Sequence, residues 1–210
     1  MPSSDHYFTD QPTSPSQPRE MTVTLRGREY RFATDAGVFS RQGVDLATRT
    51  LINALPLPFR GEVLDWGCGY GPIGVVIAAE SPEARVLMAE LNPRAADLAR
   101  QSLKLNHLAN ARVVAGDAFA TLGEQQFDVV VTNPPMHAGK ALVLRLFADV
   151  AARLRPGGEF WLVIPRKQGA KPLARELAAL LAEVRTVTIR GGHRVFCAVK
   201  ADPQEPGSGG

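Results

Sequence analysis

Residues that could bind a ligand recur at four points of this 210-residue sequence, each directly after a short apolar run. They are the segment DWGCGYGPIG at 65–74, Glu90, Asp117 and the segment NPPMH at 133–137. Glycine permits tight turns and lets a ligand approach the backbone closely. Carboxylates and amides accept hydrogen bonds from ammonium, hydroxyl and amino groups. The four points together therefore predict a binding site for a ligand that carries several polar groups.

The elements that must position these residues alternate along the chain. Short apolar strands are predicted over 62–66, 85–90, 111–116, 127–132 and 156–165, with helices over 72–80, 92–106, 139–154 and 169–183. Two further runs, 184–190 and 194–200, flank GGH and predict a hairpin. This alternation indicates a mostly parallel sheet covered by helices on both faces, with an antiparallel hairpin at one edge. Ligands of such sheets bind beyond the carboxyl ends of the strands, where the four points lie.

The sequence before residue 61 predicts a small hairpin followed by a helix. The stretch MTVTLRGREYRFAT at 21–34 alternates around RG and indicates a hairpin whose buried side carries Val23, Leu25, Tyr30 and Phe32. A helix is predicted over 44–55. We expect residues 1–20 to form a flexible arm, 21–201 a single domain whose catalytic core begins at 61, and 202–210 a disordered tail.

Composition narrows the class of protein. The chain is 45% hydrophobic and 21% charged, and its two cysteines, Cys68 and Cys197, do not form a disulfide framework typical of small secreted domains. No apolar run approaches a membrane span, and the N-terminus lacks the pattern of a secretory signal, so we expect a cytoplasmic protein. Residues 140–200 hold 12 Lys and Arg against 4 Asp and Glu. Such a basic third could attract a polyanion, although solvated helix faces produce the same excess.

The glycine segment has two interpretations. Gly69, Gly71 and Gly74 spell the G-x-G-x-x-G pattern of dinucleotide sites, and Glu90 lies near the position of their ribose-binding acid. Asp65 before the glycines and Asp117 after the third strand favour a different ligand. One carboxylate could bind an ammonium, another a ribose and a third an adenine amino group. These three groups occur together in S-adenosylmethionine.

The segments in this order resemble the class I S-adenosylmethionine-dependent methyltransferases. The resemblance covers about residues 30–200 and is closest to the small-domain group related to bacterial ribosomal RNA guanine-N2 methyltransferases of the RsmC type. It rests on VLDWGCGYGPIG, an acid closing the second strand, GDAF, GVFS at 37–40, Asp45 and Thr48, NPPMHAGK at 133–140 and RPGG at 155–158. It implies a Rossmann-like α/β fold. The larger relatives carry an additional domain before the catalytic one, for which this chain has only about 60 residues.

The resemblance also implies roles for individual residues in holding S-adenosylmethionine, and no metal is implied. The glycine loop would wrap the methionine end, with Asp65 near the ammonium. Glu90 would hold the ribose, Asp117 and the amide of Ala118 the adenine edge, and Leu91 its face. The cofactor-binding set predicted in this way is Asp65, Gly67, Cys68, Gly69, Gly71, Glu90, Leu91, Asp117, Ala118 and Asn133.

The NPPMH segment is predicted to hold the methyl acceptor. Asn133 Oδ1 and the Pro134 carbonyl could accept hydrogen bonds from an amine and stabilise its developing positive charge, while Pro135 stiffens the turn. Many amino-methyltransferases have an aromatic residue after the two prolines, where this chain has a methionine. The substrate contacts predicted here are Phe39, Met136, His137 and Lys140.

The function predicted first is therefore methyl transfer to an exocyclic base amine, guanine N2 in ribosomal RNA, with RNA as the partner and no membrane association. Three alternatives stay open. The acceptor could be DNA adenine, a protein glutamine or a small-molecule amine; the domain could bind RNA without catalysis; or it could be a dinucleotide oxidoreductase. The sequence does not indicate an oligomeric state.

Overall fold

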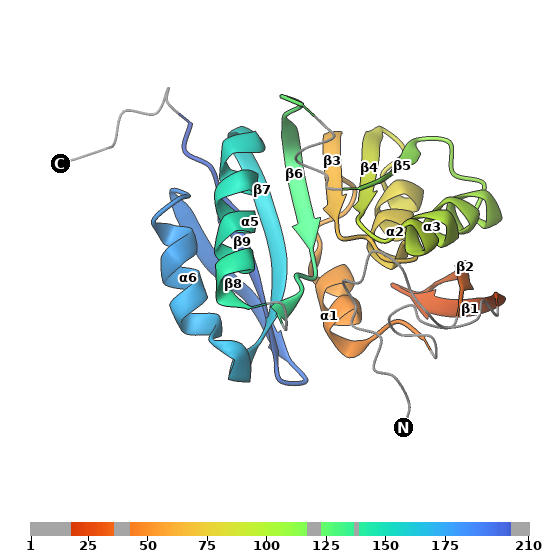
Figure 1. Cartoon of the computed structure of the whole chain (residues 1–210), viewed down its shortest axis with the longest axis horizontal. Coiled ribbons are helices and arrows are strands. Elements are labelled where there is room, and N and C mark those ends of the chain that lie inside the picture. The colour runs from red at the N-terminus through yellow and green to blue at the C-terminus, as the bar shows by residue number, and fades with distance from the viewer. Residues whose placement is uncertain (1–17, 36–42, 117–122, 137–138, 203–210) are drawn as a thin grey trace.

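A seven-stranded mixed sheet runs through the centre of the computed structural model, which describes residues 18–35, 43–116, 123–136 and 139–202 (Figure 1). The strands lie in the order β5-β4-β3-β6-β7-β9-β8. Strands β3 to β7 pair in parallel, and β9 runs antiparallel to both of its neighbours. The bounds are β3 Gly61–Trp66, β4 Ala84–Glu90, β5 Ala111–Ala115, β6 Phe127–Thr132, β7 Leu154–Pro165, β8 Glu183–Arg190 and β9 His193–Val199. The predicted α/β fold with a Rossmann-like sheet is confirmed.

Helices cover both faces of this sheet. They are α1 Leu46–Ala54, α2 Pro72–Glu80, α3 Pro93–Leu105, α5 Lys140–Arg153 and α6 Ala170–Ala178, with a short 3-10 turn, η2, at Arg166–Gln168. Successive strand residues point to opposite faces. Val63 and Met88 accordingly pack with α1, α2 and α3, whereas Leu64 and Leu87 pack with α5 and α6. The near-continuous apolar runs in the sequence therefore fill two separate cores, as expected for a sheet buried on both faces.

The N-terminal hairpin consists of β1, Arg19–Leu25, and β2, Arg28–Thr34. Its turn residues, Arg26 and Gly27, both have positive φ, which suits a tight two-residue hairpin turn. The predicted buried side is confirmed, because Val23, Leu25, Tyr30 and Phe32 are all buried. Strand β1 begins two residues before the predicted start of the domain at residue 21, since Arg19 and Glu20 already pair with Thr34 and Ala33.

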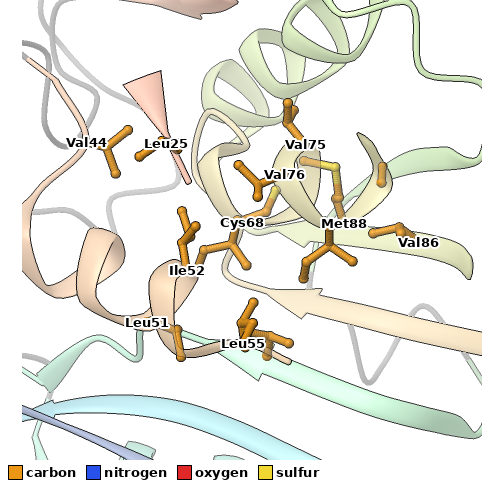
Figure 2. Close-up of a cluster of buried hydrophobic side chains, with 14 of the residues drawn as sticks. Leu25, Val44, Leu51, Ile52, Leu55, Cys68, Val75, Val76, Val86 and Met88 are labelled. Carbon is orange, nitrogen blue, oxygen red and sulfur yellow. The ribbon is translucent and has the colours of Figure 1, made fainter. Parts of the chain in front are cut away.

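Side chains from two helices hold this hairpin against the main domain. Tyr30 Oη and Arg26 Nε both donate to the carboxylate of Glu80, at the end of α2. On the other edge, the backbone N–H of Ala33 donates to Ser102 Oγ of α3 at 3.1 Å. Figure 2 shows the apolar part of the same contact, where Leu25 lies beside residues of α1 and α2. The hairpin is thus part of the domain's core.

The C-terminal part contains the predicted antiparallel hairpin, formed by β8 and β9. Strand β9 lies between β7 and β8, so the edge strand β8 runs in the same direction as β7. The last helix is shorter than predicted. Helix α6 ends at Ala178, not near 183. The chain cannot continue as a helix there, because the N–H of Ala182 already donates to the Val199 carbonyl at the end of β9.

Candidate active site

The loop after β3 turns back against the neighbouring strand. Gly67 has φ +71° and Gly71 φ +103°, in the left-handed region that favours glycine. The N–H groups of Gly67 and Cys68 both donate to the Ala89 carbonyl, at 2.9 and 3.0 Å. Gly71 is also the N-cap residue of α2, directly before its first residue. The loop therefore stands at the carboxyl ends of β3 and β4, with the start of a helix behind it.

Gly74, the last glycine of the G-x-G-x-x-G pattern, is explained by packing. A Cβ at this position would lie 2.6 to 2.9 Å from three side-chain atoms of Met88, which is fully buried in β4. Glycine here lets α2 pack closely on the sheet. Because this packing does not depend on which ligand the fold binds, the G-x-G-x-x-G pattern does not by itself indicate a dinucleotide site.

Asp65 lies at the end of β3 and is fully buried. Its Oδ2 accepts a hydrogen bond from the N–H of Gly74 at 2.8 Å, which ties α2 to the strand. Its Oδ1 has no hydrogen-bond partner among the described residues. Burial raises the pKa of this carboxyl to about 7. The hydrogen bond from the Gly74 N–H opposes this shift, and the negative charge of Glu90 adds to it. An ammonium group would satisfy Oδ1, so the predicted contact with the ligand ammonium fits an unsatisfied buried oxygen, and it stays a prediction.

Glu90, at the end of β4, joins the glycine loop to α3. Its Oε2 accepts from the N–H of Gly69 at 2.8 Å and its Oε1 from the N–H of Asn92 at 2.9 Å. Burial raises its pKa, and these two backbone donors oppose the shift. Each carboxylate oxygen retains a further lone pair for a hydroxyl group. The next residue, Leu91, is a large apolar side chain that is 42% exposed, as a surface for an adenine ring would be.

Asn133 follows β6 and is half-buried. Thr132 Oγ1 donates to the Trp66 carbonyl at 2.8 Å, so the ends of β6 and β3 are held together. Asn133 Nδ2 donates to Thr48 Oγ1 of α1 at 3.0 Å. The Pro134 carbonyl already accepts a hydrogen bond from the N–H of Met136 at 2.9 Å. Its second lone pair is left for an N–H of the amine that would receive the methyl group.

A narrow cleft brings the loop and Asn133 together. Its walls come from the start of α1, the loop after β3 and the start of α2. The lining residues are Asp45, Thr48, Gly67, Cys68, Gly69, Tyr70, Pro72, Ile73 and Asn133. Four predicted site residues thus share one cleft. Thr48 and Tyr70 had no predicted role, although Thr48 belongs to a motif that carries the family resemblance and Tyr70 stands between two loop glycines.

Met136 and Lys140 line a different pocket, on the side of the NPP segment that faces α5 and α6. The other lining residues are Val143, Gly169, Pro172 and Leu173. Lys140 Nζ lies 3.1 Å from a carboxylate oxygen of Glu176. The structure therefore places these two predicted substrate contacts next to each other, but not in the cleft with Asn133.

Four predicted site residues, Phe39, Asp117, Ala118 and His137, lie outside the described residues. The described chain ends before two of them at Gly116, whose N–H donates to the Glu90 carbonyl at 2.8 Å. Their predicted roles stay predictions.

Cys68 is not available as a nucleophile, although it lines the cleft. Its side chain is buried in the core beside α1 and α2 (Figure 2). Burial raises the pKa of the thiol well above its ordinary value, and the charges of Asp65 and Glu90 raise it further. Within the described ranges, no group of three or more His, Cys, Asp or Glu side chains is placed to hold a metal ion. The helices of those ranges include none long and apolar enough to cross a membrane.

Comparison with known proteins identifies the family to which this chain belongs. Residues 29–197 match the family described as methyltransferase small domain. The chain belongs to the methyltransferase small domain family. It is a class I S-adenosylmethionine-dependent methyltransferase related to RsmC, and S-adenosylmethionine is its cofactor. The resemblance seen in the sequence is thereby confirmed, and the oxidoreductase alternative is not supported.

The relatives of this methyltransferase differ in length. The uncharacterized protein YbxB of Bacillus subtilis is 35% identical over 94% of this chain and 99% of its own length. Ribosomal RNA large subunit methyltransferase G of Streptomyces coelicolor is 34% identical over 79% of this chain and 44% of its own length. Ribosomal RNA small subunit methyltransferase C of Pasteurella multocida is 35% identical over 64% and 42%. The chain thus spans less than half of these two enzymes.

Among solved structures, the methyltransferase is similar to the Thermus thermophilus 16S rRNA N2 G1207 methyltransferase RsmC, in complex with AdoMet and guanosine. The identity is 33%, the TM-score is 0.78, and the match covers 90% of this chain and 52% of the other. A methyltransferase from Pyrococcus furiosus matches 79% of this chain with a TM-score of 0.63 but only 20% identity, which shows the fold alone.

Proposed function

We propose that this methyltransferase transfers the methyl group of S-adenosylmethionine to an exocyclic amine of a nucleobase, and that the acceptor is guanine N2 in ribosomal RNA. The observation that carries the proposal is the orientation of the Asn133 side chain in the cleft. Because its amide nitrogen is directed at Thr48, its oxygen is the end of the amide that can accept from a substrate. Among the described residues, Asn133 Oδ1 has no hydrogen-bond partner.

An exocyclic amine needs such acceptors. Its lone pair is delocalised into the base, so the nitrogen is a poor nucleophile until it becomes pyramidal. Asn133 Oδ1 and the second lone pair of the Pro134 carbonyl can each accept one N–H, hold the nitrogen in place and stabilise its growing positive charge. When bound, S-adenosylmethionine supplies a methyl group on a positively charged sulfur. The methylated nitrogen then loses its proton to water, so a strong base is unnecessary. Asn suits this position because burying the charge of an Asp beside a neutral amine would cost free energy.

The two buried carboxylates support the placement of the cofactor. Asp65 offers an unsatisfied oxygen and Glu90 offers spare lone pairs, at adjacent strand ends beside the loop. The RsmC structure named above contains both AdoMet and guanosine, and it resembles 90% of this chain. That similarity favours guanine over adenine, glutamine or a small-molecule amine as the acceptor. A protein with this substrate would act in the cytoplasm, where ribosomal RNA is found.

The proposal is tested by identifying the methylated product. The purified protein is incubated with S-adenosylmethionine labelled in its methyl group and with RNA, DNA and protein fractions from cells that lack the gene. We expect label in ribosomal RNA, recovered after digestion as N2-methylguanosine by mass spectrometry. Label recovered as N6-methyladenine in DNA or as methylglutamine would overturn the acceptor assignment, and cofactor binding without transfer to any fraction would favour the non-catalytic alternative.

The role of Asn133 needs a separate comparison. We expect Asn133→Ala to lower kcat by about 100-fold or more, as the loss of one transition-state hydrogen bond does in other enzymes. Affinity for S-adenosylhomocysteine, measured by calorimetry, should change little, because the glycine loop and Glu90 are untouched. A parallel loss of cofactor affinity and transfer would show that Asn133 acts in cofactor binding alone.

A further inference from the structure

Three separate segments bring basic residues to the end of the sheet at which the cleft lies. We call this cluster the basic rim, and it comprises Arg166, Lys167, Arg190, His193 and Arg194. Pro165 pairs with His193, and His193 with Arg190, so the end of β7 and the turn between β8 and β9 lie together. The N–H of Arg166 donates to the Gly192 carbonyl at 2.8 Å, which joins η2 to that turn.

The basic rim adjoins the cleft through α1. A Cβ on Gly191, in the turn between β8 and β9, would collide with Leu46 Cδ2, so this turn touches the first residue of α1. Thr48, which holds Asn133, lies two residues further along the same helix. Figure 1 shows the turn at the end of the sheet where α1 and the segment after β6 are found. A nucleic acid whose base enters the cleft would therefore pass beside the rim.

The charges of the rim are available to a partner. Arg166, Lys167 and Arg190 are exposed, and none of them forms an ion pair with a carboxylate in the described part of the chain. Other cationic side chains of the C-terminal third do have acidic partners. Arg155 forms an ion pair with Asp128, and Arg145 forms one with Asp149. Asp45, the acid next to Leu46, already caps α1 through the N–H of Thr48. The rim is thus an excess of positive charge that the acidic side chains of the described residues do not neutralise.

A polyanion would be attracted to such a surface. Phosphate groups are bound by exposed Arg and Lys side chains, and each such contact releases counterions from the nucleic acid. The target base must be unpaired to reach the cleft. The nucleic acid would therefore be single-stranded around the target base, with its phosphates accessible on both sides of that base.

We propose that the basic rim binds the RNA backbone next to the methylated nucleotide, and that Arg166, Lys167 and Arg190 are the phosphate contacts. This inference rests on the proposed function for its choice of RNA as the polyanion. It adds a binding surface on the protein, made by η2 and the turn between β8 and β9, to the cleft in which the target base is proposed to bind.

The test compares two triple variants with the same change in net charge. The first, R166Q/K167Q/R190Q, removes the exposed cations of the rim. The control, R60Q/K104Q/R112Q, removes three exposed cations from the opposite region, near the amino ends of β3 and β5 and the end of α3. Binding of a fluorescent single-stranded fragment of ribosomal RNA is measured from about 50 to 300 mM salt, the range in which phosphate contacts are lost, in the presence of S-adenosylhomocysteine. Calorimetry of S-adenosylhomocysteine binding shows whether the fold and the cleft are intact.

We expect the rim variant to lose about two units from the slope of log affinity against log salt concentration, at about 0.7 for each of three phosphates, and to bind roughly tenfold more weakly or worse. The control should keep the slope of the unaltered protein, and both variants should keep its cofactor affinity. Equal salt slopes in the rim variant and the control would overturn the proposal. So would a loss of RNA affinity in the control as large as that in the rim variant.

Failure of the rim can be separated from failure of the proposed function. If ribosomal RNA is methylated but the rim variant keeps its RNA affinity and its kcat/KM, the rim is wrong and the function stands. If the rim variant loses RNA affinity and salt dependence but no RNA is methylated by the unaltered protein, the rim stands and the catalytic function is wrong.

Discussion

Asn133 and Thr48 form a hydrogen bond of 3.0 Å between side chains that are 85 positions apart in the sequence. Thr48 is itself held by the N-terminal cap of α1, because its N–H donates to Asp45 Oδ1 at 3.0 Å. An amide carries its nitrogen and oxygen on opposite sides of one carbon. A bond that directs the nitrogen toward Thr48 therefore turns Oδ1 away from it, so the helix before the catalytic core sets the orientation of the amide in the cleft.

The first prediction concerns Thr48. In Thr48→Val the hydroxyl that accepts from Asn133 is lost while the side-chain shape is kept. The amide can then rotate, and we expect kcat to fall about tenfold, which corresponds to the free energy of one hydrogen bond. The dissociation constant for S-adenosylhomocysteine should stay within about twofold of the original. Single-turnover transfer and calorimetry measure the two quantities.

The same helix provides a matched control for this substitution. Thr50 donates its hydroxyl to the Leu46 carbonyl of its own helix, so Thr50→Val removes an equivalent group from α1 without removing the acceptor for Asn133. Thr48→Ser, which keeps the hydroxyl, should restore most of the activity. If Thr50→Val lowers kcat as much as Thr48→Val, the effect belongs to the stability of α1 and not to the orientation of Asn133.

A second prediction tests the contact between Gly74 and Met88. Gly74→Ala places a methyl group within 3 Å of the fully buried Met88 side chain. Overpacking of this kind costs about 1 to 3 kcal/mol of unfolding free energy, which urea denaturation would measure. In the double variant G74A/M88A we expect a smaller cost than the sum of the two single changes, because the clash is relieved. Simple additivity would show that Met88 is not the obstacle.

The third prediction follows from the raised pKa of Asp65. The carboxyl has a pKa of about 7 in the folded protein, against an ordinary value of 3.8. Between these values the folded state binds more protons than the unfolded state, so the contribution of Asp65 to stability is fully present below about pH 4 and is lost as pH rises to about 7. Asp65→Asn should remove this pH-dependent part. Urea denaturation of both proteins between about pH 4 and pH 8 should show that their stabilities converge or cross as pH rises. A constant difference over the range would contradict the shift.

Binding of the cofactor should act on the same group. If Asp65 contacts the ammonium of the cofactor, the charged carboxylate is favoured in the complex and binding releases a proton near neutral pH. We expect S-adenosylhomocysteine affinity to increase from about pH 6 to about pH 7.5 in the unaltered protein, and the increase to be smaller in Asp65→Asn. Heats of binding measured in two buffers of different ionisation enthalpy would report the released proton directly.

The fourth prediction compares two arginines of the N-terminal hairpin. Arg26 is mostly buried, pairs with Glu80 and donates to the carbonyls of Ile52 and Leu55 at the end of α1. Arg26→Met removes the donor to both carbonyls and to one oxygen of Glu80, and should cost about 2 kcal/mol or more of unfolding free energy. Arg31→Met removes an exposed pair with Glu20 and should cost less than about 1 kcal/mol. Equal costs would show that the hairpin is not anchored through Arg26.

The elements of this protein could be predicted from local information. The apolar runs and the breaks between them place α2 at 72–80 and β6 at 127–132, in agreement with the structure. Asp45 and Asn92 are side chains that cap helices, and both helices begin directly after them. These features depend on neighbours a few positions away, so the order of residues is enough to specify them. The same holds for the strand ends at which Asp65, Glu90 and Asn133 lie.

The contacts between elements could not be predicted in this way. Nothing local in the sequence shows that β9 enters between β7 and β8, because the pairing of a strand edge depends on which partner is free after the sheet has formed. Likewise, Thr48 belongs to a recognisable motif, but its hydroxyl acquires a role only when α1 packs beside the end of β6. Residue types and spacing were therefore enough to indicate the family and the cofactor, whereas the orientation of Asn133 and the basic rim depend on packing between distant segments.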